Sequence, residues 1–162
     1  MDNNQRDVFV LSAVRTPIGR YGGGLAPVPP CDLAAAVVRE SVSRAGIDPS
    51  GVGHAVFGNV IHTETRDMYL SRVAAINGGL PAETPAFTLN RLCGSGLQAI
   101  VSAAQAVKLG DCEVAVAGGP GGAARGGFRV RNADLTCCLR ARHGWYLRWI
   151  PWVNSHEHVR CP

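Results

Sequence analysis

One cysteine stands where a nucleophile could be held. Cys93 lies within the stretch Asn-Arg-Leu-Cys-Gly-Ser-Gly-Leu-Gln-Ala-Ile of residues 90–100. The residues 85–89 before it predict a strand, and apolar residues spaced three or four apart predict a helix over residues 97–109. A helix N-terminus carries roughly half a positive charge and free N–H groups, both of which favour a thiolate. The position therefore suits a nucleophilic thiolate.

Two glycines flank this cysteine. Gly94 and Gly96 have no side chains, so a carbonyl and a bulky leaving group could reach the sulfur. The N–H of Cys93 could then donate to a developing oxyanion. The alternative is that Cys93 is a small buried core residue, as free cysteines often are. Residue types and spacing leave both interpretations open.

The elements around the turn predict an α/β fold. Buried strands are expected at residues 7–14, 54–61, 85–89 and 113–117, with a helix between each consecutive pair. The order β-α-β-α-β-α-β predicts a mostly parallel sheet with helices on both faces. In such sheets, ligands collect where the carboxyl ends of strands meet helix N-termini, and Cys93 lies at such a junction.

Each helix has its own sequence signals. The first should begin at Asp32 as N-cap and end at Gly46, with one apolar face made of Ala34, Val37, Val38, Val42 and Ala45. The second contains Met68, Leu70, Val73, Ala74 and Ile76 and stops at Gly78-Gly79. The third should present an apolar stripe of Leu97, Ile100, Val101, Ala104 and Val107 and end at Gly110.

Composition excludes several classes of protein. No apolar run approaches the roughly 18 residues that a membrane span needs, so no membrane association is expected. The first residues lack the features of a signal peptide, which predicts a cytoplasmic location. We therefore expect the six cysteines to be reduced, and because they form no Cys-x-x-Cys pair, no metal site is expected.

Four stretches, at residues 12–23, 57–81, 85–111 and 114–119, resemble the thiolase family of acyl-CoA:acetyl-CoA acyltransferases, and bacterial β-ketothiolases in particular. The resemblance implies that Cys93 is the acyl-thioester nucleophile, that coenzyme A is a co-substrate, and that no metal or redox cofactor takes part. It implies an incomplete thiolase-like N-terminal half, and members of this family are homo-oligomers.

The implied reaction has two steps. In one direction the thiolate attacks the keto carbon of a 3-ketoacyl-CoA, releases acetyl-CoA, and passes the shortened acyl group to coenzyme A. In the other direction two acetyl-CoA molecules condense. The family's Gly-His-Pro and Cys-x-Gly-Gly motifs, which supply its bases, are absent from this sequence. Turnover by this chain alone is therefore not expected.

The resemblance stops at Gly119. Residues 1–119 are interpreted as one incomplete domain, and residues 120–162 as an atypical tail without regular structure. The tail contains all three tryptophans and seven arginines but only two acidic residues. This is what a GC-rich gene gives when read in another frame. We therefore hypothesise a frameshift near codon 119, which the coding DNA read in the other two frames would test.

Motifs in the tail favour chance over function. The segment Gly119–Ala124 matches the dinucleotide fingerprint but lacks the helix and acidic residue that should follow it. His156-Glu157-His158 has the wrong spacing for two ligands on one helix face. The arginine-rich stretch with aromatic residues could indicate nucleic-acid contact, but translation of the gene in another frame explains its composition better, so no nucleic-acid partner is expected. Cys137, Cys138 and Cys161 are interpreted as sites of oxidation.

Two alternatives to an acyltransferase stay open. The chain could be a non-catalytic fragment that associates with a full-length thiolase through an uncovered strand edge or helix layer. It could also derive from the ketosynthase family, which likewise uses a cysteine at a helix tip. The segments around residues 15–23 and 62–72 favour thiolase over ketosynthase.

Overall fold

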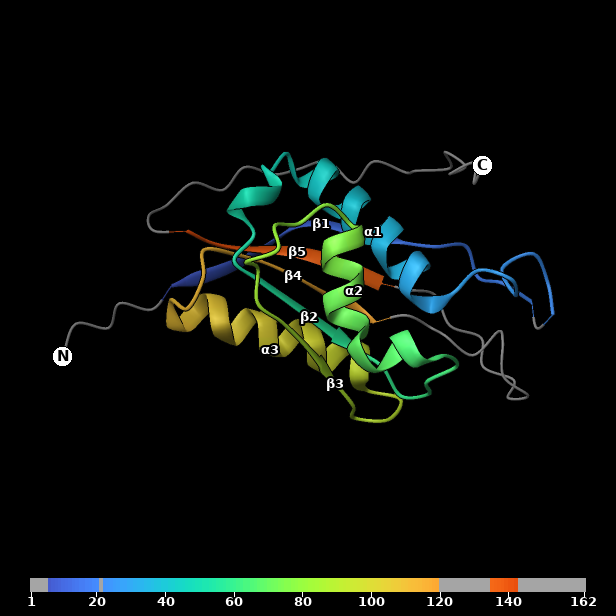
Figure 1. The fold of residues 1–162 in the computed structure, drawn as a ribbon. Coiled ribbons are helices and arrows are strands. Elements are labelled where there is room, and N and C mark those ends of the chain that lie inside the picture. Colours follow the sequence, from blue (N-terminus) through green and yellow to red (C-terminus); the bar gives the residue numbers. More distant parts are fainter. Residues whose placement is uncertain (1–5, 21, 120–134, 143–162) are drawn as a thin grey trace.

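A computed structural model describes residues 6–20, 22–119 and 135–142, which form a layered α/β structure (Figure 1). The elements of these residues follow the expected alternation of strands and helices. In chain order they are β1 (Asp7–Arg15), α1 (Pro30–Ala45), η1 (Pro49–Gly51), β2 (His54–Gly58), η2 (Thr65–Tyr69), α2 (Leu70–Asn77), β3 (Ala86–Leu89), α3 (Ser95–Leu109), β4 (Val114–Gly119) and β5 (Leu135–Arg142), where η marks a short 3-10 helix.

The sheet formed by the described residues has five strands in the order β1-β5-β4-β2-β3. β2 runs parallel to both β3 and β4, whereas β5 runs antiparallel to β4 and to β1. Four of these strands therefore point the same way. The predicted α/β fold with a mostly parallel sheet is confirmed.

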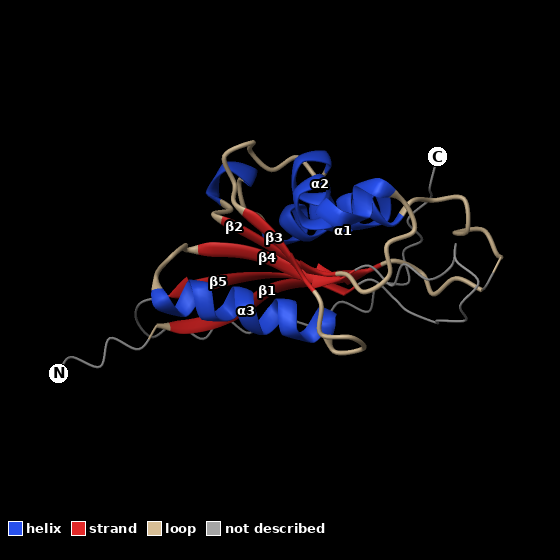
Figure 2. Ribbon diagram, turned by 60° about the horizontal axis from the view of Figure 1, so that its bottom comes forward, coloured by secondary structure: helices blue, strands red, loops and turns tan. Residues whose placement is uncertain are grey.

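Helices cover both faces of this sheet, also as predicted. α1 and α2 lie on one face and α3 on the other (Figure 2). Successive residues of β2 point to opposite faces. Phe57 packs with Val38 of α1 and Leu70 of α2, whereas Val56 lies on the other face and packs with Ala103 of α3. Because both faces are covered, a strand in this position needs apolar residues in succession rather than in alternation.

α1 has the predicted buried face and the predicted end. Its apolar residues face the core, and Gly46 closes the helix in the left-handed conformation at φ 64°. The expected N-cap is wrong: the helix begins at Pro30 with Pro29 as N-cap, and no side chain caps it. Asp32 lies in the first turn instead, 3.5 Å from the guanidinium of Arg66.

β1 is a strand, but the expectation that it is buried is wrong. Phe9 and Val10 expose 42% and 55% of their surface, and Val14 is the buried residue of this strand. Among the described residues β1 pairs on one side only, with β5, and therefore forms an edge of the sheet. An edge strand has fewer neighbours to cover its apolar side chains.

The apolar stripe predicted for α3 is also wrong in part. The buried positions are Ser95, Ala99, Ala103 and Val107, four residues apart, while Leu97 and Val101 expose 69% and 43% of their surface. Small residues face the sheet, so the helix can lie close to it. Of the larger apolar residues in the predicted stripe, Val107 is buried, whereas Leu97 and Val101 point away from the sheet.

Residues 135–142 correct a further expectation, that no regular element follows Gly119. They form β5, which lies between β1 and β4. Cys138 is completely buried there, and Thr136 is buried with a hydroxyl that has no hydrogen-bond partner in the described part of the chain. The alternation of burial is weak because this strand is covered on both faces.

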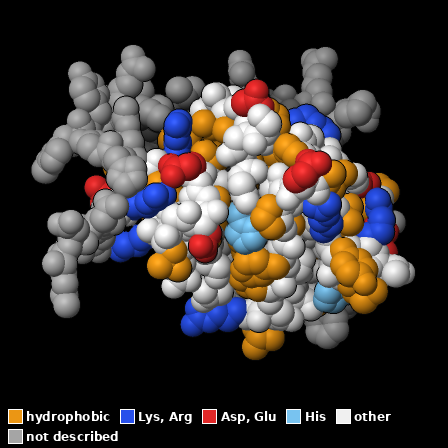
Figure 3. Space-filling model, turned by 60° about the vertical axis from the view of Figure 1, so that its left-hand side comes forward, with side chains coloured by type: hydrophobic (Ala, Val, Ile, Leu, Met, Phe, Trp, Pro, Cys, Tyr) orange, Lys and Arg blue, Asp and Glu red, His pale blue; other side chains and the backbone are white. Residues whose placement is uncertain are grey.

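The surface carries charges of both signs. On the face shown in Figure 3, acidic and basic side chains are interspersed with apolar ones. Within the three described ranges, no helix combines the length and the apolar character needed to cross a membrane.

Candidate functional site

Cys93 lies in the short turn that joins β3 to α3, at the carboxyl end of a parallel strand. Its side chain is exposed, so the interpretation as a buried core residue is wrong. α3 has Gly94 as N-cap, one residue after the cysteine. The predicted strand-to-helix junction is therefore present, and Cys93 is exposed to solvent there.

Free amide donors lie directly after this sulfur. Helical hydrogen bonding in α3 begins with the N–H of Gln98, which donates to the carbonyl of Gly94 at 2.9 Å. Within this described turn, the N–H groups of Gly96 and Leu97 come before that bond and make no intrahelical bond of their own. Together with the positive end of the helix dipole, they favour negative charge near the start of α3.

The turn has an unusual backbone. Leu92, the residue before the cysteine, has φ 49°, a value that is uncommon for residues other than glycine. Side chains on both sides hold it. The Asn90 Oδ1 accepts the N–H of Leu92 at 2.9 Å, and the Ser95 hydroxyl accepts the N–H of Arg91 at 2.8 Å and donates to the carbonyl of Leu92 at 2.7 Å.

Glycines at the ends of two strands let α3 approach the sheet. A Cβ added to Gly58, the last residue of β2, would lie 2.5 Å from the carbonyl carbon of Ser95. One added to Gly119, the last residue of β4, would lie 3.2 Å from the Cα of Gly96. A Cβ added to Gly96 itself would meet nothing within 4 Å. The start of α3 therefore sits tightly on the strand ends, with open space on the side of Gly96.

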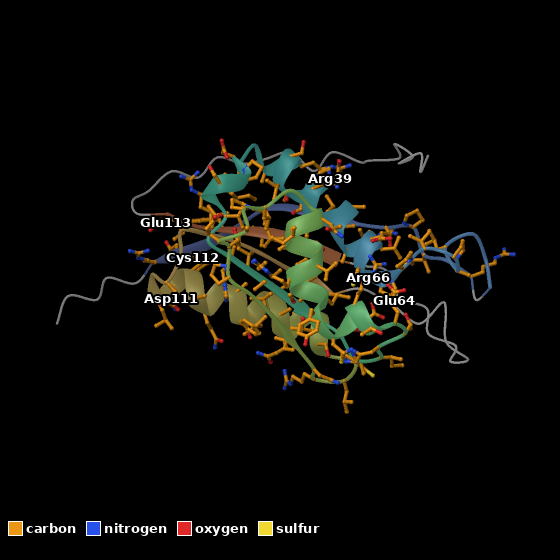
Figure 4. All side chains as sticks on the ribbon, viewed as in Figure 1. Arg39, Glu64, Arg66, Asp111, Cys112 and Glu113 are labelled. Atoms are coloured by element: carbon orange, nitrogen blue, oxygen red, sulfur yellow. The ribbon has the colours of Figure 1, made fainter. Side chains whose placement is uncertain are left out.

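A buried carboxylate organises the loop after β2. Asp67 is completely buried, and its Oδ2 accepts the N–H and hydroxyl of Thr63 at 2.7 and 2.9 Å and the N–H of Glu64 at 3.1 Å. Its backbone carbonyl accepts the side-chain amide of Asn59 at 2.9 Å. Figure 4 shows Glu64 and Arg66 beside one another at this loop. These contacts are structural and lie outside the turn of the cysteine.

The other described cysteines differ from Cys93 in being buried: they are Cys31, Cys112, Cys137 and Cys138. Burial, with a hydrogen bond to Asp67 and its charge, raises the pKa of Cys31 to about 12. Burial, with the neighbouring Cys137, raises the pKa of Cys138 to about 11. Burial also raises the pKa of Cys112 and of Cys137. All four therefore stay protonated thiols at neutral pH.

Sequence reasoning located Cys93 and its two glycines but missed Asn90, Ser95 and Leu92. Asparagine and serine commonly hydrogen-bond to nearby backbone in turns, and this was the available signal. The left-handed conformation of Leu92 had none, because leucine rarely adopts it.

Metal and nucleotide sites were not expected. In the ranges that the structure describes, no group of three or more His, Cys, Asp or Glu side chains could hold a metal ion. The fingerprint-like segment after Gly119, His156-Glu157-His158, and Cys161 lie outside the described residues.

Comparison with known proteins places this geometry in context. Residues 8–121 match the family described as "Thiolase, N-terminal domain". The chain is 56% identical over 139 residues to the beta-ketothiolase BktB of Cupriavidus necator, and 42% identical over 127 residues to a mitochondrial 3-ketoacyl-CoA thiolase of Bos taurus. These matches cover 80% and 78% of this chain but 35% and 32% of the relatives, so the chain spans about a third of their length.

Solved structures give the same result. The acetyl-CoA acetyltransferase of Bacillus anthracis superposes with a TM-score of 0.73 at 38% identity, covering 80% of this chain and 33% of that one. Human mitochondrial 3-ketoacyl-CoA thiolase in complex with CoA superposes with the same TM-score and identity, covering 78% and 32%.

Proposed function

The chain belongs to the thiolase family, and from this premise we propose that Cys93 accepts an acyl group from an acyl-CoA thioester. The observation that carries the proposal is the exposure of this one sulfur at the start of α3, while the other described cysteines are buried. The whole reaction would be 3-ketoacyl-CoA thiolysis or its reverse, the condensation of two acetyl-CoA molecules. Relatives named for both activities resemble this chain.

The acyl transfer itself exchanges one thioester for another. The sulfur of Cys93 attacks the carbonyl carbon of the acyl-CoA, and the carbonyl oxygen becomes an oxyanion. When the intermediate collapses, the bond from carbon to the sulfur of coenzyme A breaks. Coenzyme A leaves as a thiolate and takes up the proton that Cys93 has released. The products are an S-acyl cysteine and coenzyme A.

The turn supplies two aids to this step. The amide N–H groups at the start of α3 and the helix dipole stabilise negative charge on the sulfur and on the oxyanion. The N–H of Cys93 is the donor nearest in sequence to the reacting sulfur. The open space beside Gly96 leaves room for the large leaving group, since a side chain there would occupy it.

A full catalytic cycle needs bases that this sequence does not contain in the family's motifs. We therefore propose that the 162-residue chain takes up one acyl group and stops at the acyl-enzyme. Because the exchange of thioesters is close to neutral in free energy, an excess of acyl-CoA is needed to populate this species.

Mass spectrometry of the intact chain tests the proposal. After incubation with excess acetyl-CoA, we expect one acetyl group on a peptide that contains Cys93, removable by hydroxylamine. Cys93→Ala should take up none, and the matched Cys112→Ala should behave as the unaltered chain. Absence of acetylation on Cys93, or equal acetylation of Cys93→Ala, would overturn the proposal. Steady-state thiolysis of a 3-ketoacyl-CoA by the purified chain would overturn its single-turnover part.

A second candidate function is association with a full-length thiolase. Two observations favour it: Leu97 and Val101 are exposed on α3, and β3 is an edge strand among the described residues, with Phe87 exposed on it. Light scattering after size-exclusion chromatography tests it. A monomer that melts cooperatively and does not co-elute with added beta-ketothiolase would contradict association.

A further inference from the structure

We infer that Ser95 is a positioning residue for Cys93: its buried hydroxyl holds the backbone turn that presents the sulfur. This inference rests on the proposed function, because the orientation of the sulfur matters only if Cys93 accepts the acyl group. Ser95 would act on the reaction through the backbone of the turn, to which its hydroxyl bonds, and not by touching the reacting atoms.

The backbone that needs holding is that of Leu92. Its φ of 49° belongs to the left-handed region, which leucine rarely occupies, and its side chain is exposed. Packing of the leucine side chain therefore does little to enforce this conformation. Because Cys93 is the next residue, a return of Leu92 to an ordinary conformation would turn the cysteine to a different direction.

The Ser95 hydroxyl bonds to the backbone on both sides of this residue. It accepts the N–H of Arg91 at 2.8 Å and donates to the carbonyl of Leu92 at 2.7 Å. The backbone N–H of Ser95 donates to the same carbonyl at 3.0 Å. Both the donor and the acceptor capacity of the hydroxyl are therefore used within the turn.

Ser95 is itself fixed to the sheet. It is buried, and its backbone lies so close to Gly58 at the end of β2 that a Cβ on that glycine would overlap it. Asn90, which accepts the N–H of Leu92, is exposed and lacks such an anchor. Ser95 is thus the residue through which the rigid sheet determines the direction of Cys93.

The test compares acylation rates in the full 162-residue chain. Ser95→Ala removes the hydroxyl, and Ser102→Ala is the matched control, since its hydroxyl lies on the same helix and contacts Gln98 at 3.3 Å. The rate at which acetyl-CoA acetylates Cys93 is measured by peptide mass spectrometry. We expect Ser95→Ala to lower this rate about tenfold, as the loss of one or two hydrogen bonds would. Ser102→Ala should stay within about twofold of the unaltered chain.

Two further readouts separate positioning from a loss of folding. Cys112, beyond the far end of α3 (Figure 4), is buried and should stay protected from iodoacetamide in Ser95→Ala. Leu92→Gly should restore acylation when combined with Ser95→Ala, because glycine adopts a positive φ at little cost. Leu92→Gly alone should react at the unaltered rate.

The inference is overturned if Ser95→Ala acetylates Cys93 at the unaltered rate, if its loss of rate is matched by exposure of Cys112, or if Leu92→Gly restores nothing. The first of these results leaves the proposed function intact, since acylation of Cys93 would still occur. Absence of acetylation in the unaltered chain overturns the proposed function and, with it, this inference.

Discussion

Replacement of Gly58 by alanine should separate the start of α3 from the sheet. The added Cβ would lie 2.5 Å from the carbonyl carbon of Ser95 and 2.6 Å from its Cβ and oxygen. Ordinary contacts between carbon atoms are about 3.5–4.0 Å, so the first turn of the helix must move away by about 1 Å. Backbone lies on the far side of the contact, and no flexible side chain can move aside.

Two effects should follow, and both can be measured. Overpacking of this kind costs about 1–3 kcal/mol, which should lower the urea midpoint of unfolding followed by circular dichroism. A displacement of about 1 Å at a reacting group can cost up to about 100-fold in rate, so acetylation of Cys93 should slow by more than the loss of folded protein explains.

Gly96→Ala is the matched control for this substitution. Its added Cβ meets nothing within 4 Å, and alanine is a better helix former than glycine by about 0.5–1 kcal/mol. This variant should therefore unfold at the same or a higher urea concentration. If Gly58→Ala unfolded at the unaltered midpoint and acetylated Cys93 at the unaltered rate, the reasoning about close seating of α3 would be refuted.

Three other predictions follow from the thiols and the buried carboxylate. At neutral pH iodoacetamide should modify Cys93 well before Cys31, whose thiol is buried with its pKa raised to about 12; equal rates by peptide mass spectrometry would contradict this. Folding raises the pKa of Cys31 from 9.0, so the unfolded chain loses this proton at a lower pH than the folded chain does. The contribution of the Cys31 thiol to the free energy of unfolding is therefore complete below pH 9 and is lost as the pH rises towards about 12. Urea midpoints in this range should therefore fall less steeply for Cys31→Ser, and identical slopes would refute the linkage. Asp67→Asn should lower the free energy of unfolding by about 2–3 kcal/mol, because a carboxylate that accepts four hydrogen bonds is replaced by a neutral amide; an unchanged midpoint would show that the loop needs no carboxylate.

Much of this fold was predictable from the spacing of apolar residues. Four strands, the helices between them, and the place of Cys93 at a strand-to-helix turn all follow from local patterns. The N-cap of α1 could not be predicted in this way. Asp32 satisfied the usual rule for an N-cap, but the helix begins earlier, at Pro30, with Pro29 as N-cap.

Errors arose where burial depends on neighbours distant in sequence. The pattern of α3 favoured Leu97 and Val101 as buried because they are large and apolar, yet small residues such as Ala99 and Ala103 face the sheet. The exposure of β1 could not be foreseen either, because its place at the sheet edge is determined by β5. For the same reason the sequence did not indicate a role for Ser95, because that role depends on its contacts with Gly58 and Leu92 in the folded structure.

The position of β5 has a consequence for the order in which this chain can assemble. β1, the first described strand, joins the sheet only through the last described strand, since residues 135–142 lie between it and β4. Its ladder must wait until more than a hundred further residues have been synthesised, and closing so long a loop is slow. Until then β4 offers a free edge to any other nascent chain. A chain stopped before residue 135 would keep β1 without a strand partner, and such chains should associate rather than complete the sheet.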